Sequence, residues 1–310
     1  MHYLSMIFFQ VVAPILVLLI VGGLLQKKFQ FNLKALSSLV TYCLMPVAVF
    51  LNIFETKIDA IILGQIILYF FAFSFTLMLI STILSKLLRL KGPKAAVFKN
   101  SIVLINSGNY GLPVSQMLFA TNPLGTSVQI MMVVFQNLIT YTYGLYNLIA
   151  TSKSGFAIIR DIFKLPIVHG LILGIVMNVW NIPLPNFVHI PLSHLADAFI
   201  AIAIITLGAQ LSKIKVKTLL NKMLYLSCFG RLIIGPIVAY CLIRLFHFDG
   251  VIAQSLLIAS SFPTSRNSSS LALEYDVESD LAAQTVLMTT IVSCITVTIV
   301  IYFAKMMFPI

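Results

Sequence analysis

The sequence Asn106-Ser107-Gly108-Asn109-Tyr110-Gly111-Leu112-Pro113 lies in the middle of an apolar run that extends over residues 96–119. Glycine and proline both weaken a helix, and proline also lacks a backbone donor. Backbone groups that lose their helical partners in apolar surroundings cost several kcal/mol unless protein or water satisfies them. We therefore expect residues 106–113 to form an opened helix whose backbone and amide side chains line a cavity.

The composition of the chain places it in a lipid bilayer. Of its 310 residues, 60% are hydrophobic and 9% are charged, whereas about a quarter of the residues in a soluble domain are charged. This balance excludes a soluble enzyme, a disordered chain and a fibrous protein. The apolar runs are long and unbroken, which indicates helices, because the strands of a membrane barrel alternate apolar and polar residues over short segments.

Ten apolar runs are long enough to be candidate membrane spans, since a helix needs about 20 residues to cross the hydrocarbon core. They cover residues 5–25, 36–54, 61–85, 96–119, 126–149, 166–182, 193–211, 222–246, 251–273 and 281–304. The odd-numbered connections carry fifteen Lys and Arg residues, and the opposite side carries three. Basic loops stay in the cytoplasm, so we expect a multi-pass protein of the cell membrane with both termini outside.

The net charge of +11 comes mostly from basic residues at the ends of these runs, and it does not indicate a nucleic-acid partner. The four cysteines lie in apolar runs, without a metal-binding spacing such as Cys-x-x-Cys. The sequence therefore predicts no metal site, no cofactor and no catalytic residues.

A second apolar run, residues 251–273, is interrupted by polar residues at 263–270. Arg266 lies near its middle, and an arginine at that depth usually faces a cavity or a partner, because exposing it to lipid costs at least a few kcal/mol. The amino ends of half-helices present free N–H groups and a positive dipole. Two breaks that meet near the midplane would form a site for a negatively charged group, to which Arg266 adds a full charge.

The two interruptions occupy matching places in the chain. A shift of 158 residues aligns Ser107 with Ser265 and Asn109 with Asn267. Ten spans divide into five and five, and because five is odd, two such halves have opposite orientations in the membrane. Inverted repeats of this kind are typical of secondary transporters. The expected repeats cover residues 1–152 and 153–310.

Candidate binding residues come from both interruptions. They are Asn106, Ser107, Asn109, Tyr110, Pro113, Pro263, Ser265, Arg266 and Asn267. Milder interruptions are expected at Pro46, in the run 36–54, and at its counterpart near Gln210, in the run 193–211. We expect Pro46, Gly108, Gly111 and Gln210 to break helices or support the cavity.

With these residues in view, the chain resembles the auxin efflux carrier family. The string at 106–113 resembles the family's signature at its first crossover, and Pro46 within Leu-Met-Pro is similar to the proline of its second span. Residues 270–275 and 280–283 resemble the end of its ninth span and the start of its tenth. The resemblance covers essentially the whole chain.

The resemblance implies an all-α membrane protein of ten transmembrane helices, arranged as two inverted five-helix repeats in which helices 4 and 9 are broken and cross. It also implies a scaffold domain beside a moving transport domain, often within a homodimer. Known members move organic anions: auxin in plants, and malate or malonate-like acids as proposed for bacterial members. Asn109, Pro113, Pro263 and Asn267 match the crossovers, whereas many relatives carry a small or apolar residue in place of Arg266.

The sequence therefore predicts a secondary transporter that moves a small organic anion, a mono- or dicarboxylate, by alternating access. Two other classes stay open, a channel or sensor on the same scaffold and an intramembrane enzyme. An enzyme could use Ser107 and His169, but no nucleophile motif such as Gly-x-Ser-x-Gly is present. Because no acidic residue falls clearly at the centre of a span, uniport, proton symport and sodium coupling all stay open.

Overall fold

The structure is a computed structural model that describes residues 9, 13–55, 60–149, 166–213 and 221–310. In these residues the chain is helical throughout, apart from loops and one isolated antiparallel β-bridge. The helices of the first half are α2 (Ala13–Phe29), α3 (Leu33–Leu39), α4 (Met45–Glu55), α5 (Ala60–Leu87), α6 (Gly92–Val103), α7 (Leu112–Leu118), α8 (Pro123–Ile139) and α9 (Leu145–Ile149). Those of the second half are α11 (Pro166–Val179), α12 (Asn186–Leu211), α13 (Lys222–Phe229), α14 (Gly235–Leu245), α15 (Gly250–Ser260), α16 (Arg266–Glu274) and α17 (Ser279–Met307).

Four π-helical turns connect helices within the described part of the chain. They are η2 (Val40–Leu44), η3 (Ser107–Gly111), η4 (Thr140–Gly144) and η5 (Gly230–Ile234). Three of them join two α-helices directly into one longer, bent helix, as η2 joins α3 to α4. The interruption expected at Pro46 is this η2 turn, which ends at Leu44, and Pro46 is the second residue of α4.

Within the described residues, five helices are long and apolar enough to cross a membrane. They cover residues 33–55, 64–87, 186–211, 222–245 and 279–307. The expected runs 96–119 and 251–273 each contain two shorter helical segments, because their polar segments end one helix and start another. The chain is thus an all-helical, multi-pass membrane protein.

Two predicted interruptions differ in detail from the structure. Residues 107–118 are helical, and the chain leaves the helix earlier, at residues 104–106. Pro113 is in the first turn of α7, where proline fits a helix. The milder break expected near Gln210 is absent, because α12 continues without interruption to Leu211.

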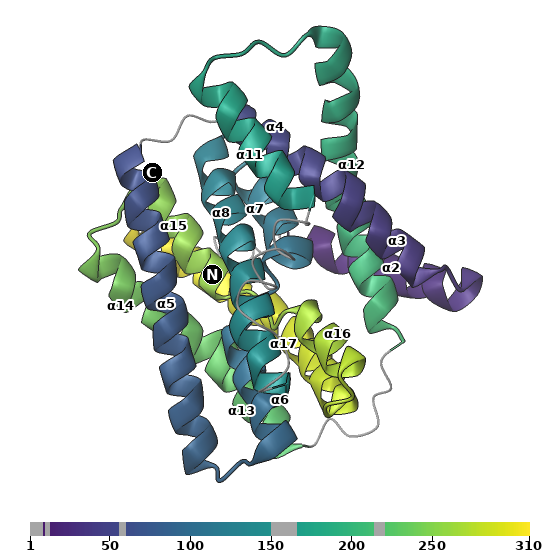
Figure 1. Cartoon of the computed structure of the whole chain (residues 1–310), viewed down its shortest axis with the longest axis vertical. Helices are drawn as coiled ribbons and strands as arrows, with labels where there is room; N and C mark the ends of the chain where they lie inside the picture. The colour runs from purple at the N-terminus through teal and green to yellow at the C-terminus, as the bar shows by residue number, and fades with distance from the viewer. Residues whose placement is uncertain (1–8, 10–12, 56–59, 150–165, 214–220) are drawn as a thin grey trace.

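The helices pack in two groups. In Figure 1, α2, α3, α4, α11 and α12 lie together in the upper and right-hand part of the molecule, and α5, α6 and α13–α17 lie below and to the left. The larger core cluster is formed mainly by α5, α8, α14, α15 and α17, and a smaller cluster joins α4, α11 and α12. The first group is therefore called the upper group and the second the lower group.

Glycine lets two helices of the upper group approach each other at backbone distance. A Cβ atom at Gly22 of α2 would collide with the carbonyl oxygen of Ile205, and one at Gly208 of α12 would collide with that of Leu19. Lipid tails are as apolar as leucine, so membrane helices associate through such close packing and not through the hydrophobic effect. Small residues at these positions therefore fix α2 against α12.

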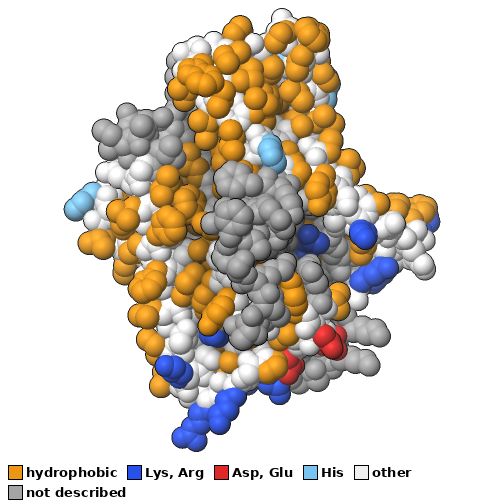
Figure 2. Space-filling model, viewed as in Figure 1, with side chains coloured by type: hydrophobic (Ala, Val, Ile, Leu, Met, Phe, Trp, Pro, Cys, Tyr) orange, Lys and Arg blue, Asp and Glu red, His pale blue; other side chains and the backbone are white. Residues whose placement is uncertain are grey.

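The surface is apolar over most of its extent. Phe75 and Ile295 are 66% and 65% exposed, and large hydrophobic side chains are exposed on most of the long helices. Figure 2 shows this apolar surface over the upper part of one face, with Lys and Arg gathered toward the lower end and the right-hand edge. Such a surface is the one that a protein presents to lipid tails.

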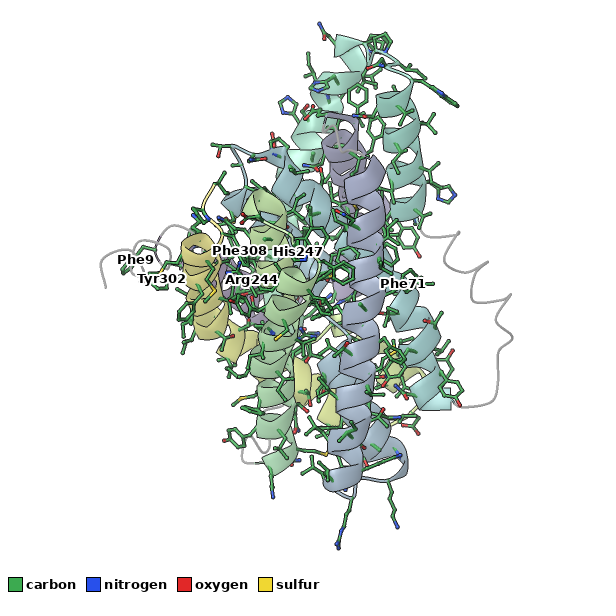
Figure 3. All side chains as sticks on the ribbon, turned by 90° about the vertical axis from the view of Figure 1, so that its left-hand side faces the viewer. Phe9, Phe71, Arg244, His247, Tyr302 and Phe308 are labelled. Carbon is green, nitrogen blue, oxygen red and sulfur yellow. The ribbon has the colours of Figure 1, made fainter. Side chains whose placement is uncertain are left out.

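Aromatic and amide contacts hold the end of α17. The Arg244 guanidinium lies 5.0 Å from the ring centroid of Phe308 and 5.4 Å from that of Tyr240. Gln254 donates to the Phe308 carbonyl at 2.6 Å. Figure 3 shows Arg244 and Phe308 side by side next to this helix end, which is thereby fixed against α14 and α15.

Candidate functional site

The two interrupted helices meet in extended backbone. Ile105 and Thr264 form the antiparallel bridge. Two flanking backbone hydrogen bonds, each 2.8 Å long, join residues 104–106 to residues 263–265. We call residues 104–106 and 261–265 the two breaks, and their meeting point the crossing.

The carbonyl groups at the ends of α6 and α15 also find protein partners. Thr264 Oγ1 donates to the Ser101 carbonyl at 2.7 Å. Arg231 donates to the carbonyl groups of Ile102 and Ser260, at 2.6 and 2.5 Å. Opened backbone is tolerated at membrane depth only where protein or water satisfies it. The crossing meets that condition, because each break has partners in the other break and the helix ends have a further partner in Arg231 of η5.

New helices begin directly after both breaks. The η3 turn starts at Ser107, and α16 starts at Arg266. Ser265 caps α16, since its side chain accepts a hydrogen bond from the Asn267 amide at 3.2 Å. The first amides of a helix have no intrahelical acceptor, and the helix dipole is positive there. Two amino-terminal ends therefore come together where the chain resumes its helical path.

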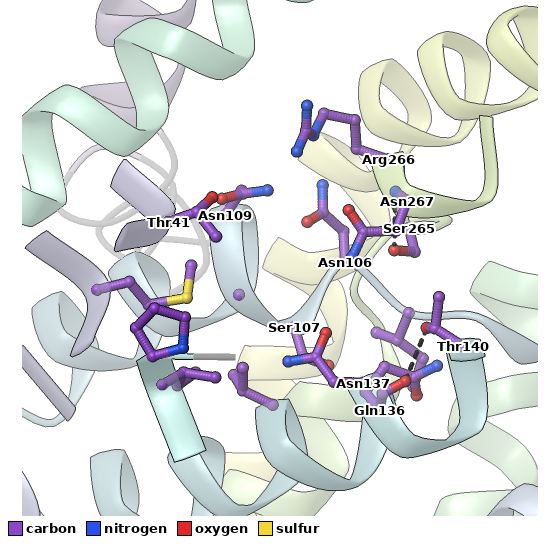
Figure 4. A pocket seen from close by; sticks show the side chains of 16 residues that line it. Thr41, Asn106, Ser107, Asn109, Gln136, Asn137, Thr140, Ser265, Arg266 and Asn267 are labelled. Atoms are coloured by element: carbon purple, nitrogen blue, oxygen red, sulfur yellow. Dashed lines mark hydrogen bonds between the residues drawn. The ribbon is translucent and has the colours of Figure 1, made fainter. Parts of the chain in front are cut away.

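A cavity of about 140 Å³ lies at these two helix starts. Its lining comes from η2, α4, both breaks, η3, α8, η4, α11 and α16: Thr41, Met45, Ile105, Asn106, Ser107, Gly108, Asn109, Val133, Gln136, Asn137, Thr140, Pro166, Ile167, Ser265, Arg266 and Asn267. Figure 4 shows Asn106, Asn109 and Asn137 around the same space, with Arg266 at its edge. A single water needs roughly 10–15 Å³ on this measure, so the cavity has room for about ten, the scale of a small organic molecule.

Three buried donors face this cavity without a protein partner. Asn106 Nδ2, Ser107 Oγ and Gln136 Nε2 are buried and make no hydrogen bond within the described part of the chain. Burying a polar group without a partner costs about 1–3 kcal/mol. Three donors left available around one cavity suit a ligand that is rich in acceptors.

The charge around the cavity is positive. Arg266 is the one charged side chain among its described lining residues, and no carboxylate is among them. The amino-terminal ends of η3 and α16 add partial positive charge. An anion at this position would meet favourable electrostatics from all three sources.

Seven of the predicted residues line the cavity, and the others lie elsewhere. The seven are Asn106, Ser107, Gly108, Asn109, Ser265, Arg266 and Asn267. Pro263 belongs to the crossing through its backbone. Tyr110 is buried against Phe262, with ring centroids 5.7 Å apart, and its hydroxyl accepts from Ser293 of α17 at 3.3 Å. Gly111 packs on the same Phe262 ring, since a Cβ atom there would be 2.5 Å from it.

The remaining three predicted residues support the helices without lining the cavity. Pro113 is buried in α7. The carbonyl of Pro46 meets α11 so closely that a Cβ atom at Gly170 would lie 2.5 Å from it. Gln210 donates to Ser37 of α3 at 2.6 Å and thus joins two helices of the upper group.

Sequence reasoning missed four polar residues of the cavity: Thr41, Gln136, Asn137 and Thr140. A signal was present for two of them, because Gln136 and Asn137 are adjacent polar residues within the apolar run 126–149. Thr41 and Thr140 carry no such signal, since threonine is ordinary in an apolar helix. Both lie in π-helical turns, and so do three other lining residues. Such turns are frequent at functional sites, but the sequence does not reveal them.

The lipid-facing surface, the interrupted helices and the polar cavity together define a multi-pass membrane protein with an internal polar cavity. Over residues 7–301 the chain matches the family described as membrane transport protein, and it belongs to this family, that of the auxin efflux carriers. The resemblance stated from the sequence is thereby confirmed.

Two relatives carry the same kind of description. An uncharacterized transporter of Methanocaldococcus jannaschii is 26% identical over 306 residues, covering 94% of this chain and 97% of the relative. An uncharacterized transporter of Methanothermobacter thermautotrophicus is 24% identical over 192 residues, covering 62% of each. The family and these relatives are membrane transporters and not enzymes, so the chain is a transporter.

Proposed function

We propose that this chain is a secondary transporter of a small organic anion, a mono- or dicarboxylate, and that the cavity at the crossing is its binding site. The observation that carries the proposal is the set of three buried, unpartnered donors on Asn106, Ser107 and Gln136. Two helix amino termini and Arg266 supply positive charge at the same place. Carboxylate oxygens are the acceptors that such a combination of donors and charge would hold.

The position of the cavity supports alternating access. Thr41, Met45, Pro166 and Ile167 come from the upper group, and the crossing, α8 and η4 come with the lower group. Transporters with repeats expose a site alternately by rocking one helix bundle against the other. A site lined from both groups changes its access whenever one group moves against the other, as a scaffold and a transport domain would.

The backbone supports two inverted repeats, residues 1–152 and 153–310, of five spans each. Helix α5 ends at Leu87 and α14 ends at Leu245, which is the shift of 158 residues again. Positive φ angles recur at the same shift. They are 53° at Arg89, 56° at His247, 52° at Gly92 and 55° at Gly250. With this topology, the distribution of Lys and Arg supports a cell-membrane protein with both termini outside.

Three coupling modes are to be distinguished: uniport, proton symport and sodium coupling. Asparagine and serine oxygens at the cavity can also be ligands for sodium, which several broken-helix transporters hold in this way. Uptake measured with a sodium gradient, with a proton gradient and with neither distinguishes the three modes. The homodimer that the resemblance implies is checked in the same preparation by cross-linking in the membrane.

The test uses purified protein in proteoliposomes, with malonate, malate and acetate as anions and their amides as neutral analogues. Arg266→Ala is expected to weaken carboxylate binding about tenfold or more, because a hydrogen bond to a charged group is worth roughly 1.5–3 kcal/mol. The neutral amides should lose much less. Arg244→Ala is the matched control, since Arg244 lies against Phe308 and not at the cavity. No saturable uptake of any carboxylate, or equal losses for acids and amides, would contradict the proposal.

A further inference from the structure

Arg231 is fully buried, with 0% of its side chain exposed, and it does not line the cavity. It belongs to the η5 turn between α13 and α14. Its Nη1 donates to the Ile102 carbonyl and its Nη2 to the Ser260 carbonyl. A buried guanidinium is costly unless its charge is compensated, so its two acceptors need an explanation.

The two acceptors hold equivalent places in the two halves of the chain. Ile102 is in the last turn of α6 and Ser260 is the last residue of α15, and their numbers differ by the repeat shift of 158. Each helix carries about half a negative charge at its carboxyl end. One guanidinium therefore faces two half-charges that together equal about one negative charge. The matching position in the first half is Phe73, so one arginine serves both helices.

Two glycines make room for this arrangement. A Cβ atom at Gly235 would lie 2.6 Å from Arg231 Nη2 and 3.2 Å from the Ser260 carbonyl oxygen. A Cβ atom at Gly230 would lie 2.6 Å from Ile102 Cδ1. The η5 turn can therefore lie directly against both helix ends, and the guanidinium reaches both carbonyl groups at once.

We propose that Arg231 is a positioning residue that ties the carboxyl ends of both broken helices together and cancels their negative charge, so that the cavity beyond the breaks can hold an anion. Without the Arg231 guanidinium, the negative carboxyl ends of α6 and α15 would lie a few residues before Asn106 and Ser265. Asn106 and Ser265 line the cavity in which an anion binds under the proposed function. With the guanidinium, the positive amino ends of η3 and α16 dominate. The two hydrogen bonds also make the two half-helices move as one body.

The part of this proposal that concerns anions rests on the proposed function, so the experiment has two readouts. The first is binding of malonate and malonamide to the purified protein, measured as the rise in unfolding temperature with ligand concentration. The second is hydrogen exchange of peptides that cover residues 100–106 and 258–265, with residues 13–29 and 186–211 as the reference. The variants are Arg231→Gln, Arg231→Lys and Gly235→Ala, with Gly64→Ala as control, because a Cβ atom at Gly64 meets nothing within 4 Å.

Arg231→Gln is expected to weaken malonate binding about tenfold, the size of effect that a unit charge has over about 10 Å at an effective dielectric constant of about 20. Gly235→Ala should weaken it less, because it displaces the guanidinium but keeps its charge. Malonamide binding should change little, and Arg231→Lys should keep most of the malonate affinity. Exchange should rise at both breaks together, but not in the reference peptides. Gly64→Ala should behave as the unmodified protein.

Each failure has a distinct meaning. If the unmodified protein binds no carboxylate, the proposed function fails, and the exchange data alone decide whether Arg231 ties the helix ends. Unchanged exchange at both breaks in Gly235→Ala overturns the tie. Equal losses of malonate and malonamide overturn the electrostatic role. If Arg231→Gln does not fold, Gly235→Ala still displaces the guanidinium while keeping its charge. Arg231→Lys still tests whether a positive charge at this position is enough to keep malonate binding.

Discussion

Ile105 and Thr264 lie in different halves of the chain and pair as an antiparallel bridge at the point where both interrupted helices open. Each break thereby supplies the hydrogen-bond partners that the other one lacks. Neither break would be stable in an apolar environment without the other, because its free backbone groups would have no hydrogen-bond acceptor or donor. The two breaks are therefore expected to form together, and a substitution that weakens one should also destabilise the other.

Thr264→Val tests this dependence. The substitution keeps the shape of the side chain but removes the hydroxyl that donates to the Ser101 carbonyl. We expect a loss of stability of about 1 kcal/mol, the usual scale for a buried hydrogen bond in a membrane protein. Thermal unfolding in detergent measures it. Thr285→Val is the control, because within the described residues the Thr285 hydroxyl bonds to the Leu281 carbonyl one turn back in its own helix. This substitution should lower the stability by less than Thr264→Val does.

Ser107→Ala separates binding from folding. The Ser107 hydroxyl is buried and has no partner within the described chain, so its removal relieves a cost of about 1 kcal/mol or more. We expect a higher unfolding temperature without substrate and weaker substrate binding in the same variant. A protein that is both less stable and fully active would show that this hydroxyl has a structural role only.

Gln136 and Gln210 offer a comparison between two buried or half-buried amides in different places. Gln136 lines the cavity with its Nε2 available, whereas Gln210 bonds to Ser37 between α12 and α3. Gln136→Ala is expected to raise the KM for the anion about tenfold, as the loss of a bond to a charged group does. Gln210→Ala should leave the KM unchanged and lower the unfolding temperature. The reverse result would place the site next to α12.

Gly22→Ala tests the contact between α2 and α12. The added methyl group would collide with the carbonyl oxygen of Ile205, which is backbone and cannot rotate away. We expect the two helices to separate and stability to fall by about 1–3 kcal/mol, as in other overpacked sites. Gly64→Ala, which meets no atom within 4 Å, should change stability by less than about 1 kcal/mol.

Part of the candidate site follows from local sequence. Asn106, Ser107 and Asn109 were predicted as binding residues because they interrupt an apolar run, and the structure places all three at the cavity. Tyr110 is adjacent to them in sequence, yet its side chain packs against Phe262 and α17. The direction of a side chain depends on how the η3 turn is rotated against its neighbours, and no local pattern encodes that rotation.

The sequence by itself determined the bilayer as solvent, the positions of the two polar interruptions and the family. It did so because hydropathy, helix-breaking residues and a shared motif are local properties that need no knowledge of packing. The tertiary structure alone decided that Gln136 and Thr41 share a cavity with Arg266, and that Arg231 joins the ends of α6 and α15. In a soluble helix the apolar face reveals the core. In a membrane helix the faces toward lipid and toward protein are both apolar, so contacts between helices follow from packing and not from the pattern of residues.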